Sequence, residues 1–174
     1  MKPSLFLIGG QIGAGKTTTA QKLSKMLDIP KMSVDETIKK IIPHPSNEGK
    51  DTPFNTKELV ICYNVFALTA EYLLSHNISL IIDGAFAKKS QRDLVINVAK
   101  KYNCPHYFLH ITCPDEILKE RSAKRYKDGK GVGWKAHLQL KKTFEPIDID
   151  HYTIDTSKNI EKQLKDFVKN IKKL

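Results

Sequence analysis

Eight residues near the start of the chain have the types and the spacing of a phosphate-binding loop, G-x-x-x-x-G-K-[ST]. They read Gly10-Gln11-Ile12-Gly13-Ala14-Gly15-Lys16-Thr17. Glycines let successive backbone N–H groups point at a phosphate, the lysine can reach the β- and γ-phosphates, and the threonine hydroxyl can ligate Mg²⁺. An apolar run precedes the loop and a helical pattern follows it, which favours a functional loop over a glycine-rich turn without a ligand. We therefore predict binding of ATP and Mg²⁺, with these nucleotide-binding residues: Gly10, Gly13, Ala14, Gly15, Lys16, Thr17 and Thr18.

A carboxylate at the end of a buried strand is the expected partner of this loop. Asp83 follows the apolar residues Leu80-Ile81-Ile82. An acid in this position beside a phosphate-binding loop typically holds Mg²⁺, directly or through water. The alternative is an ordinary aspartate that forms a turn. The loop favours the functional interpretation, so Thr17 and Asp83 are the predicted metal ligands.

A second acid, Asp35, comes directly after a short predicted strand. Ligands of open parallel sheets lie at the carboxyl ends of the strands. A carboxylate there can take the proton from an attacking hydroxyl or orient it. The competing role for Asp35 is to cap a helix that starts at Glu36. Catalysis by Lys16 and Asp35 is the hypothesis that we prefer.

Two arginines lie four residues apart on a predicted helix, Arg121 and Arg125, so they share one face. A guanidinium can stack on a base or bind phosphate oxygens with two hydrogen bonds. A glycine-rich basic segment follows, and residues 125–136 are expected to form a lid that closes over the transferred phosphate and excludes water. Arg125 is the third predicted catalytic residue, beside Lys16 and Asp35. The alternative is a basic, solvated helix end.

The elements that must position these residues alternate between strand and helix patterns, which predicts an α/β fold with a parallel sheet. Helical patterns cover 58–74, 90–102, 115–121 and 159–174, and five apolar runs read as strands: 4–9, 31–34, 78–83, 106–113 and 151–155. The length of 174 residues predicts one domain, 1–174. The loop at 43–56 is long enough to suggest a function, and we place the acceptor-binding region at about 35–60.

Charge and composition limit the partners. The net charge is +10, and residues 119–143 hold nine basic and two acidic residues. This cluster makes nucleic-acid binding through 119–143 an open alternative, because positive charge attracts phosphates. No stretch approaches 18 apolar residues, so no membrane partner is expected. The three cysteines lack metal spacing, which indicates reduced thiols in a cytoplasmic protein.

These motifs together resemble the P-loop kinases of the nucleoside/shikimate-kinase-like superfamily. The chain is most similar to small predicted kinases related to the 5′-kinase domain of polynucleotide kinase, zeta toxins and chloramphenicol phosphotransferase. The resemblance spans nearly the whole chain and rests on the loop at 10–17, Ser33-Val34-Asp35, Ile82-Asp83-Gly84 with Arg92, Cys113-Pro114-Asp115 with Arg121 and Arg125, Phe144-Glu145-Pro146, and Ile154-Asp155-Thr156.

The resemblance implies a three-layer P-loop fold whose five parallel strands lie in the order 2-3-1-4-5. It implies Asp35 at the acceptor hydroxyl, Arg121 near the adenine, Arg125 on the phosphates and Thr156 at the border of the base. Arg92 faces either the acceptor or the surface. The pattern of polynucleotide kinases places an arginine three residues after the catalytic aspartate, where this chain has Ile38.

The sequence therefore predicts an ATP-dependent kinase that phosphorylates a hydroxyl of a small-molecule or nucleoside-like acceptor. The first alternative is a polynucleotide 5′-hydroxyl or nucleotide kinase, which the basic cluster favours and Ile38 opposes. The second is a non-catalytic protein that binds ATP and acts as a regulator or binds nucleic acid.

Overall fold

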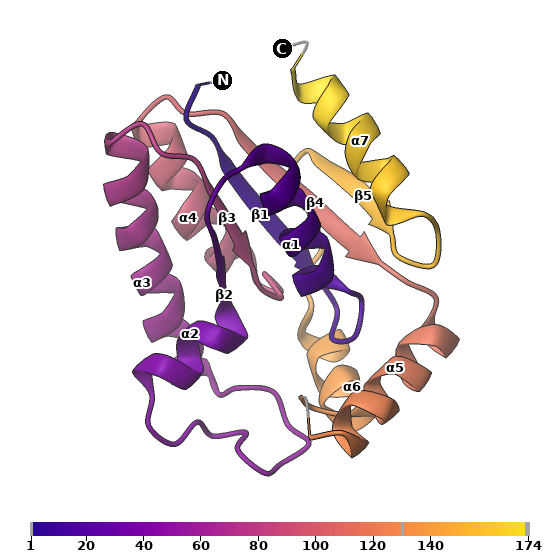
Figure 1. Cartoon of the computed structure of the whole chain (residues 1–174). Helices are drawn as coiled ribbons and strands as arrows, with labels where there is room; N and C mark the ends of the chain where they lie inside the picture. The colour runs from indigo at the N-terminus through magenta and orange to yellow at the C-terminus, as the bar shows by residue number, and fades with distance from the viewer. Residues whose placement is uncertain (1, 130, 173–174) are drawn as a thin grey trace.

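Five parallel strands form one twisted sheet in the order β2-β3-β1-β4-β5, as predicted. The computed structural model describes residues 2–129 and 131–172, so the expected domain, lid, basic cluster and last helix each extend to residues outside the described part. The strands are β1 (Leu5–Gly10), β2 (Lys31–Ser33), β3 (Leu80–Asp83), β4 (His106–Thr112) and β5 (His151–Asp155). The parallel pairing brings all their carboxyl ends to one edge of the sheet (Figure 1).

Helices cover both faces of the sheet because β1 is apolar on both sides. Phe6 and Ile8 belong to one buried cluster, and Leu5 and Leu7 belong to another. Continuous apolar runs of this kind are typical of parallel strands buried on both faces. The first cluster packs against α1 (Lys16–Leu27) and α7 (Ile160–Ile171), and the second against α2 (Val34–Ile41), α3 (Thr56–Ser75) and α4 (Lys89–Lys101).

Two further helices, α5 (Asp115–Lys127) and α6 (Trp134–Thr143), lie beyond the carboxyl edge of the sheet (Figure 1). The sequence predicted a lid at 125–136 and no helix after it. The structure has a ten-residue helix there. Its buried residues, Ala136 and His137, hold it against the rest of the domain.

The helix α3 is long and apolar enough, by length and composition alone, to cross a membrane. In the structure it is a core helix instead, because its inner face packs on the sheet through buried side chains that include Tyr63, Phe66 and Leu74. Its outer face exposes Leu68 and Tyr72.

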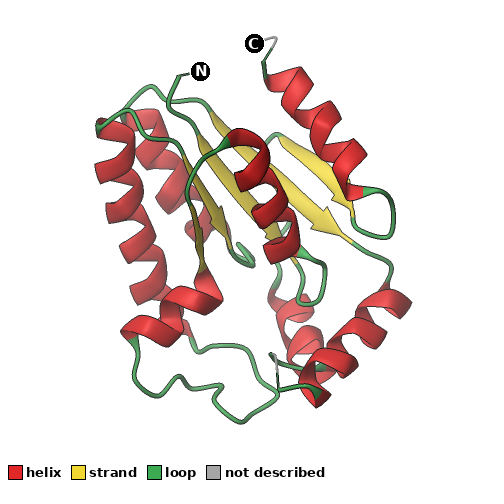
Figure 2. Cartoon of the chain, viewed as in Figure 1, coloured by secondary structure: helices red, strands yellow, loops and turns green. Residues whose placement is uncertain are grey.

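The long connection between α2 and α3 runs as an irregular loop toward α5 and α6 (Figure 2). Its return into α3 is fixed by the buried carboxylate of Glu58, which accepts hydrogen bonds from the Ser46 hydroxyl and from the backbone N–H of Asn55. The Asn55 side chain accepts in turn from the Glu58 N–H, which completes a capping box. The loop between α2 and α3 is therefore anchored, although it has no regular structure.

Candidate active site

The phosphate-binding loop joins β1 to α1 at the carboxyl edge of the sheet. Gly13 and Gly15 have φ values of +82° and +92°, which side-chain-bearing residues rarely adopt. Gly15 caps α1 in the left-handed conformation, and the first turn of α1 holds no acidic residue. The N-terminal end of α1 therefore presents its backbone N–H groups and its partial positive charge to an anion.

Lys16 lies folded on this loop, where its Nζ donates a hydrogen bond to the Gln11 carbonyl at 2.9 Å. Burial lowers the pKa of Lys16, and the nearby carboxylates of Asp35 and Asp83 oppose this shift. The positive charge of Arg125 lowers the pKa of Lys16 further. The charges of Asp35, Asp83 and Arg125 therefore all act on Lys16.

Asp83 is the buried polar centre of the site and is only 3% exposed. Its Oδ1 accepts hydrogen bonds from the hydroxyls of Thr17, at 3.4 Å, and Ser33, at 3.2 Å. Burial raises its pKa to about 6, the charge of Lys16 opposes this shift, and the charge of Asp35 adds to it. Sequence reasoning assigned no contact to Ser33, whose partner lies fifty residues away.

The second oxygen of Asp83, Oδ2, is buried and has no hydrogen-bond partner among the described residues. A buried carboxylate oxygen without a partner is costly unless a ligand completes it. A carboxylate and a neighbouring threonine hydroxyl are oxygen donors of the kind that Mg²⁺ prefers. No group of three or more metal-binding side chains occurs in the described part of the chain, so nucleotide phosphates and water would supply the remaining ligands.

Asp35 lies in the first turn of α2 and is exposed to solvent. The helix begins at Val34 and its N-cap is Ser33, so the alternative role of Asp35 as a cap for a helix starting at Glu36 is wrong. The carboxylate is close enough to raise the pKa values of both Lys16 and Asp83. It is therefore the exposed acid next to the phosphate-binding loop.

Arg121 and Thr156 meet on the other side of the loop. The guanidinium donates to the Thr156 hydroxyl at 2.9 Å and to its carbonyl at 3.2 Å, and it also contacts the sulfur of Cys113. The Thr156 hydroxyl donates to the Ala14 carbonyl at 2.8 Å. This chain of contacts ties the ends of β4 and β5 to the phosphate-binding loop.

Arg125 and Thr18 are both exposed. Thr18 lies in the first turn of α1, and Arg125 lies one turn beyond Arg121 on α5, with its guanidinium beside Gly131. Their roles in nucleotide binding remain predictions.

The helix α6 contacts both the loop between α2 and α3 and the phosphate-binding loop. Asp51 accepts the backbone N–H groups of Gly133, Lys135 and Ala136, at 2.7, 3.2 and 3.1 Å, and so caps the start of α6. Farther along, His137 contacts the carbonyl of Ile12. Sequence reasoning missed both residues because each partner is more than 80 positions away.

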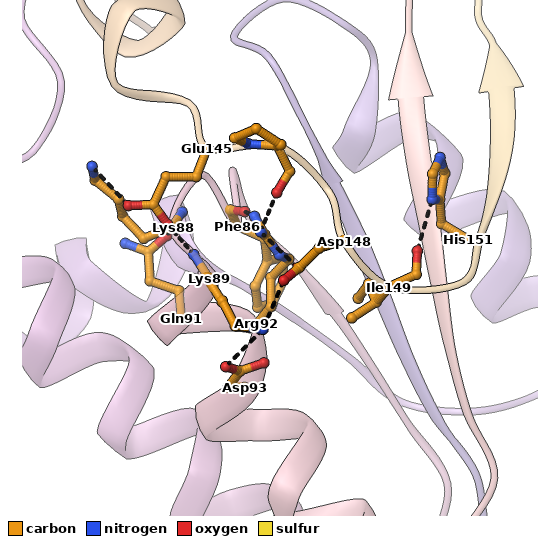
Figure 3. A network of polar contacts seen from close by, with 11 residues as sticks. Phe86, Lys88, Lys89, Gln91, Arg92, Asp93, Glu145, Asp148, Ile149 and His151 are labelled. Atoms are coloured by element: carbon orange, nitrogen blue, oxygen red, sulfur yellow. Dashed lines mark hydrogen bonds and ion pairs between the residues drawn. The ribbon is translucent and has the colours of Figure 1, made fainter.

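Arg92 is fully buried and faces neither the acceptor nor the surface, contrary to both expectations. It donates to the carbonyls of Phe86, at 3.0 Å, and Pro146, at 2.6 Å, and it pairs with Asp148 at 3.5 Å (Figure 3). Arg92 thereby links the segment after α6, at Pro146, to the segment after β3, at Phe86. Asp83 is the last residue of β3.

The family model AAA_33, described as an AAA domain, matches residues 5–147. The chain belongs to this family. A comparison with the curated proteins gives no match.

Solved kinases share the fold over nearly the whole chain. A sugar kinase from Janibacter sp. is 21% identical, with a TM-score of 0.68 over 97% of this chain and 94% of that one. A gluconokinase from Sinorhizobium meliloti is 16% identical, with a TM-score of 0.70 over 97% and 95%. The Mycobacterium tuberculosis APS kinase, in complex with AMPPNP and APS, is 11% identical, with a TM-score of 0.72 over 98% of each chain. The chain therefore has the P-loop NTPase-like fold that these kinases share.

Proposed function

We propose that the chain is an ATP-dependent kinase that transfers the γ-phosphoryl group to a hydroxyl of a small-molecule or nucleoside-like acceptor. The observation that carries this proposal is the buried carboxylate of Asp83. Its Oδ1 accepts from the Thr17 hydroxyl at the phosphate-binding loop, and its Oδ2 has no hydrogen-bond partner among the described residues. A buried aspartate with a purely structural role would have hydrogen-bond partners for both carboxylate oxygens. In a metal-binding aspartate, one oxygen has no protein partner because the metal ion binds there.

Each residue then has a physical role. The loop and the start of α1 bind the phosphates, and Lys16 releases the Gln11 carbonyl to contact them. Thr17 and Asp83 would hold Mg²⁺, which supplies charge neutralisation at the β- and γ-phosphates. Asp35 orients the acceptor hydroxyl and takes up its proton. Arg125 adds positive charge where negative charge accumulates during transfer.

The base would lie near Arg121 and Thr156, and the acceptor between Asp35 and the loop at 43–55. The similar kinases named above act on a sugar, gluconate and APS, which supports a small acceptor. The comparisons do not support nucleic acid as the acceptor, so the polynucleotide kinase alternative ranks second. A non-catalytic ATP-binding regulator would bind ATP without any acceptor-dependent turnover.

The test measures ADP release from Mg·ATP with a panel of nucleosides, nucleotides, sugars, sugar acids and 5′-hydroxyl oligonucleotides. We expect one class of hydroxyl acceptor to raise ADP release well above the basal rate. The matched control is Lys16→Ala, in which the rate should fall about 10²–10³-fold because one charge-stabilising donor is lost. Intact ATP binding without stimulation by any acceptor would favour the regulator, and normal turnover in Lys16→Ala would refute the mechanism.

A further inference from the structure

A histidine 125 positions farther along the chain contacts one peptide group of the phosphate-binding loop. The Nδ1 of His137, on α6, lies 3.2 Å from the carbonyl oxygen of Ile12. A carbonyl oxygen only accepts hydrogen bonds, so Nδ1 must carry the proton. The other ring nitrogen, Nε2, is buried and has no hydrogen-bond partner among the described residues. The geometry therefore assigns a neutral ring with a fixed tautomer.

Two contacts keep the His137 ring in place. It stacks on Trp134, with ring centroids 4.2 Å apart and an interplanar angle of 10°, and the whole residue is buried. The start of α6 is fixed by Asp51, which accepts three of its backbone N–H groups. Because ring and helix are both fixed, the imidazole is a rigid donor to the Ile12 carbonyl.

The direction of this carbonyl determines the direction of the next N–H group. A peptide unit is planar and trans, so the Ile12 carbonyl and the Gly13 N–H point in opposite directions. His137 holds the carbonyl toward α6, which turns the Gly13 N–H away from α6. That N–H donates no hydrogen bond within the described residues, whereas the preceding Gln11 carbonyl accepts from both Lys16 and the Ala14 N–H.

We propose that His137 is a positioning residue that orients the Ile12–Gly13 peptide, so that the Gly13 N–H is preset to bind a nucleotide phosphate. The inference rests on the proposed function only in requiring nucleotide at this loop. Glycines make the loop easy to rotate, and a reversed peptide would direct a carbonyl oxygen at the phosphate. Holding the peptide in advance removes this competing state and strengthens binding.

The test compares His137→Leu with His137→Asn. The two side chains are similar in size and both lack the stacking ring, but only asparagine keeps an N–H donor at the δ position. Calorimetric titration should give an ATP and an ADP dissociation constant about tenfold larger for His137→Leu than for His137→Asn. Adenosine, which lacks phosphates, should bind both variants equally in ligand-observed NMR. Thermal unfolding of each variant checks that it is folded.

Equal ATP affinity in the two variants would overturn the inference, and so would an equal loss for adenosine. A second measurement needs no variant: ¹⁵N NMR of the unmodified protein should show His137 protonated at Nδ1, and the Nε2–H tautomer would overturn the assignment. Binding is measured without acceptor, so a protein that binds ATP as expected but phosphorylates nothing refutes only the kinase proposal. Failure of the unmodified protein to bind ATP would refute both.

Discussion

Replacing Asp83 by asparagine should change how the stability of the ligand-free protein depends on pH. Burial raises the pKa of Asp83 from 3.8 to about 6. The folded state therefore holds this proton more tightly than the unfolded chain does. The resulting stabilisation is complete below pH 3.8 and is lost as the pH rises through about 6. Above that pH, the folded protein holds an ionised carboxylate in a buried position.

The size of the effect follows from the shift. About two pKa units at 1.36 kcal/mol each amount to ~3 kcal/mol, of which about half, ~1.4 kcal/mol, falls between pH 5 and pH 8. Asparagine does not titrate, so the stability of Asp83→Asn relative to the unmodified protein should rise by ~1.4 kcal/mol over this interval. Any constant cost of the new amide cancels, because only the change with pH is compared.

The assay is urea unfolding of both proteins at pH 5, 6, 7 and 8, without nucleotide or Mg²⁺. The matched control is Asp115→Asn. A hydrogen bond from Lys141 holds the pKa of Asp115 below its usual range, so its carboxyl stays ionised throughout and its difference should stay flat. If the stability difference between Asp83→Asn and the unmodified protein also stays constant with pH, or changes in the opposite direction, the idea that ionised Asp83 destabilises the ligand-free protein is refuted.

Three further outcomes can be measured. Asp35→Asn should lower turnover at least tenfold and leave the ATP dissociation constant within twofold, because the carboxylate acts on the acceptor; loss of ATP binding would contradict this role. Asp51→Ala removes the acceptor of three N–H groups at the start of α6 and should cost about 1–2 kcal/mol in urea unfolding, with Asp51→Asn nearer to the unmodified protein. Arg92→Leu should destabilise the domain by about 2–3 kcal/mol, since it removes the donor of the buried Phe86 carbonyl and of the partly buried Pro146 carbonyl, and a change below 1 kcal/mol would argue against this role of Arg92.

The phosphate-binding loop and the sheet could be predicted because their signals are local. The motif occupies eight consecutive residues, and each strand is a short apolar run. The order of the strands is not local information, and it came from the resemblance to a kinase superfamily. The structure confirms this order.

The side chains that fasten the site could not be predicted, because their partners are backbone groups far along the chain. The helix α6 has no acid at its start, and its capping carboxylate, Asp51, lies 82 positions before Gly133. Arg92 looks like a surface or substrate-binding arginine in the sequence, yet its partners are the carbonyls at 86 and 146. Pattern reasoning detects apolar periodicity and motifs, but it does not show which distant carbonyl a buried cation will satisfy.

These contacts also limit which part of the expected lid can move. A rotation of α6 away from the domain would break its contacts with two loops. It would break the three N–H contacts to Asp51, in the loop between α2 and α3, and the contact from His137 to Ile12, in the phosphate-binding loop. At about 1 kcal/mol for each hydrogen bond, the cost is ~4 kcal/mol. The end of α5 is held less firmly by burial, because its residues beyond Ser122 are all exposed. We therefore expect nucleotide to move Arg125 with the end of α5, while α6 stays in place as the rigid wall that joins the phosphate-binding loop to the acceptor side.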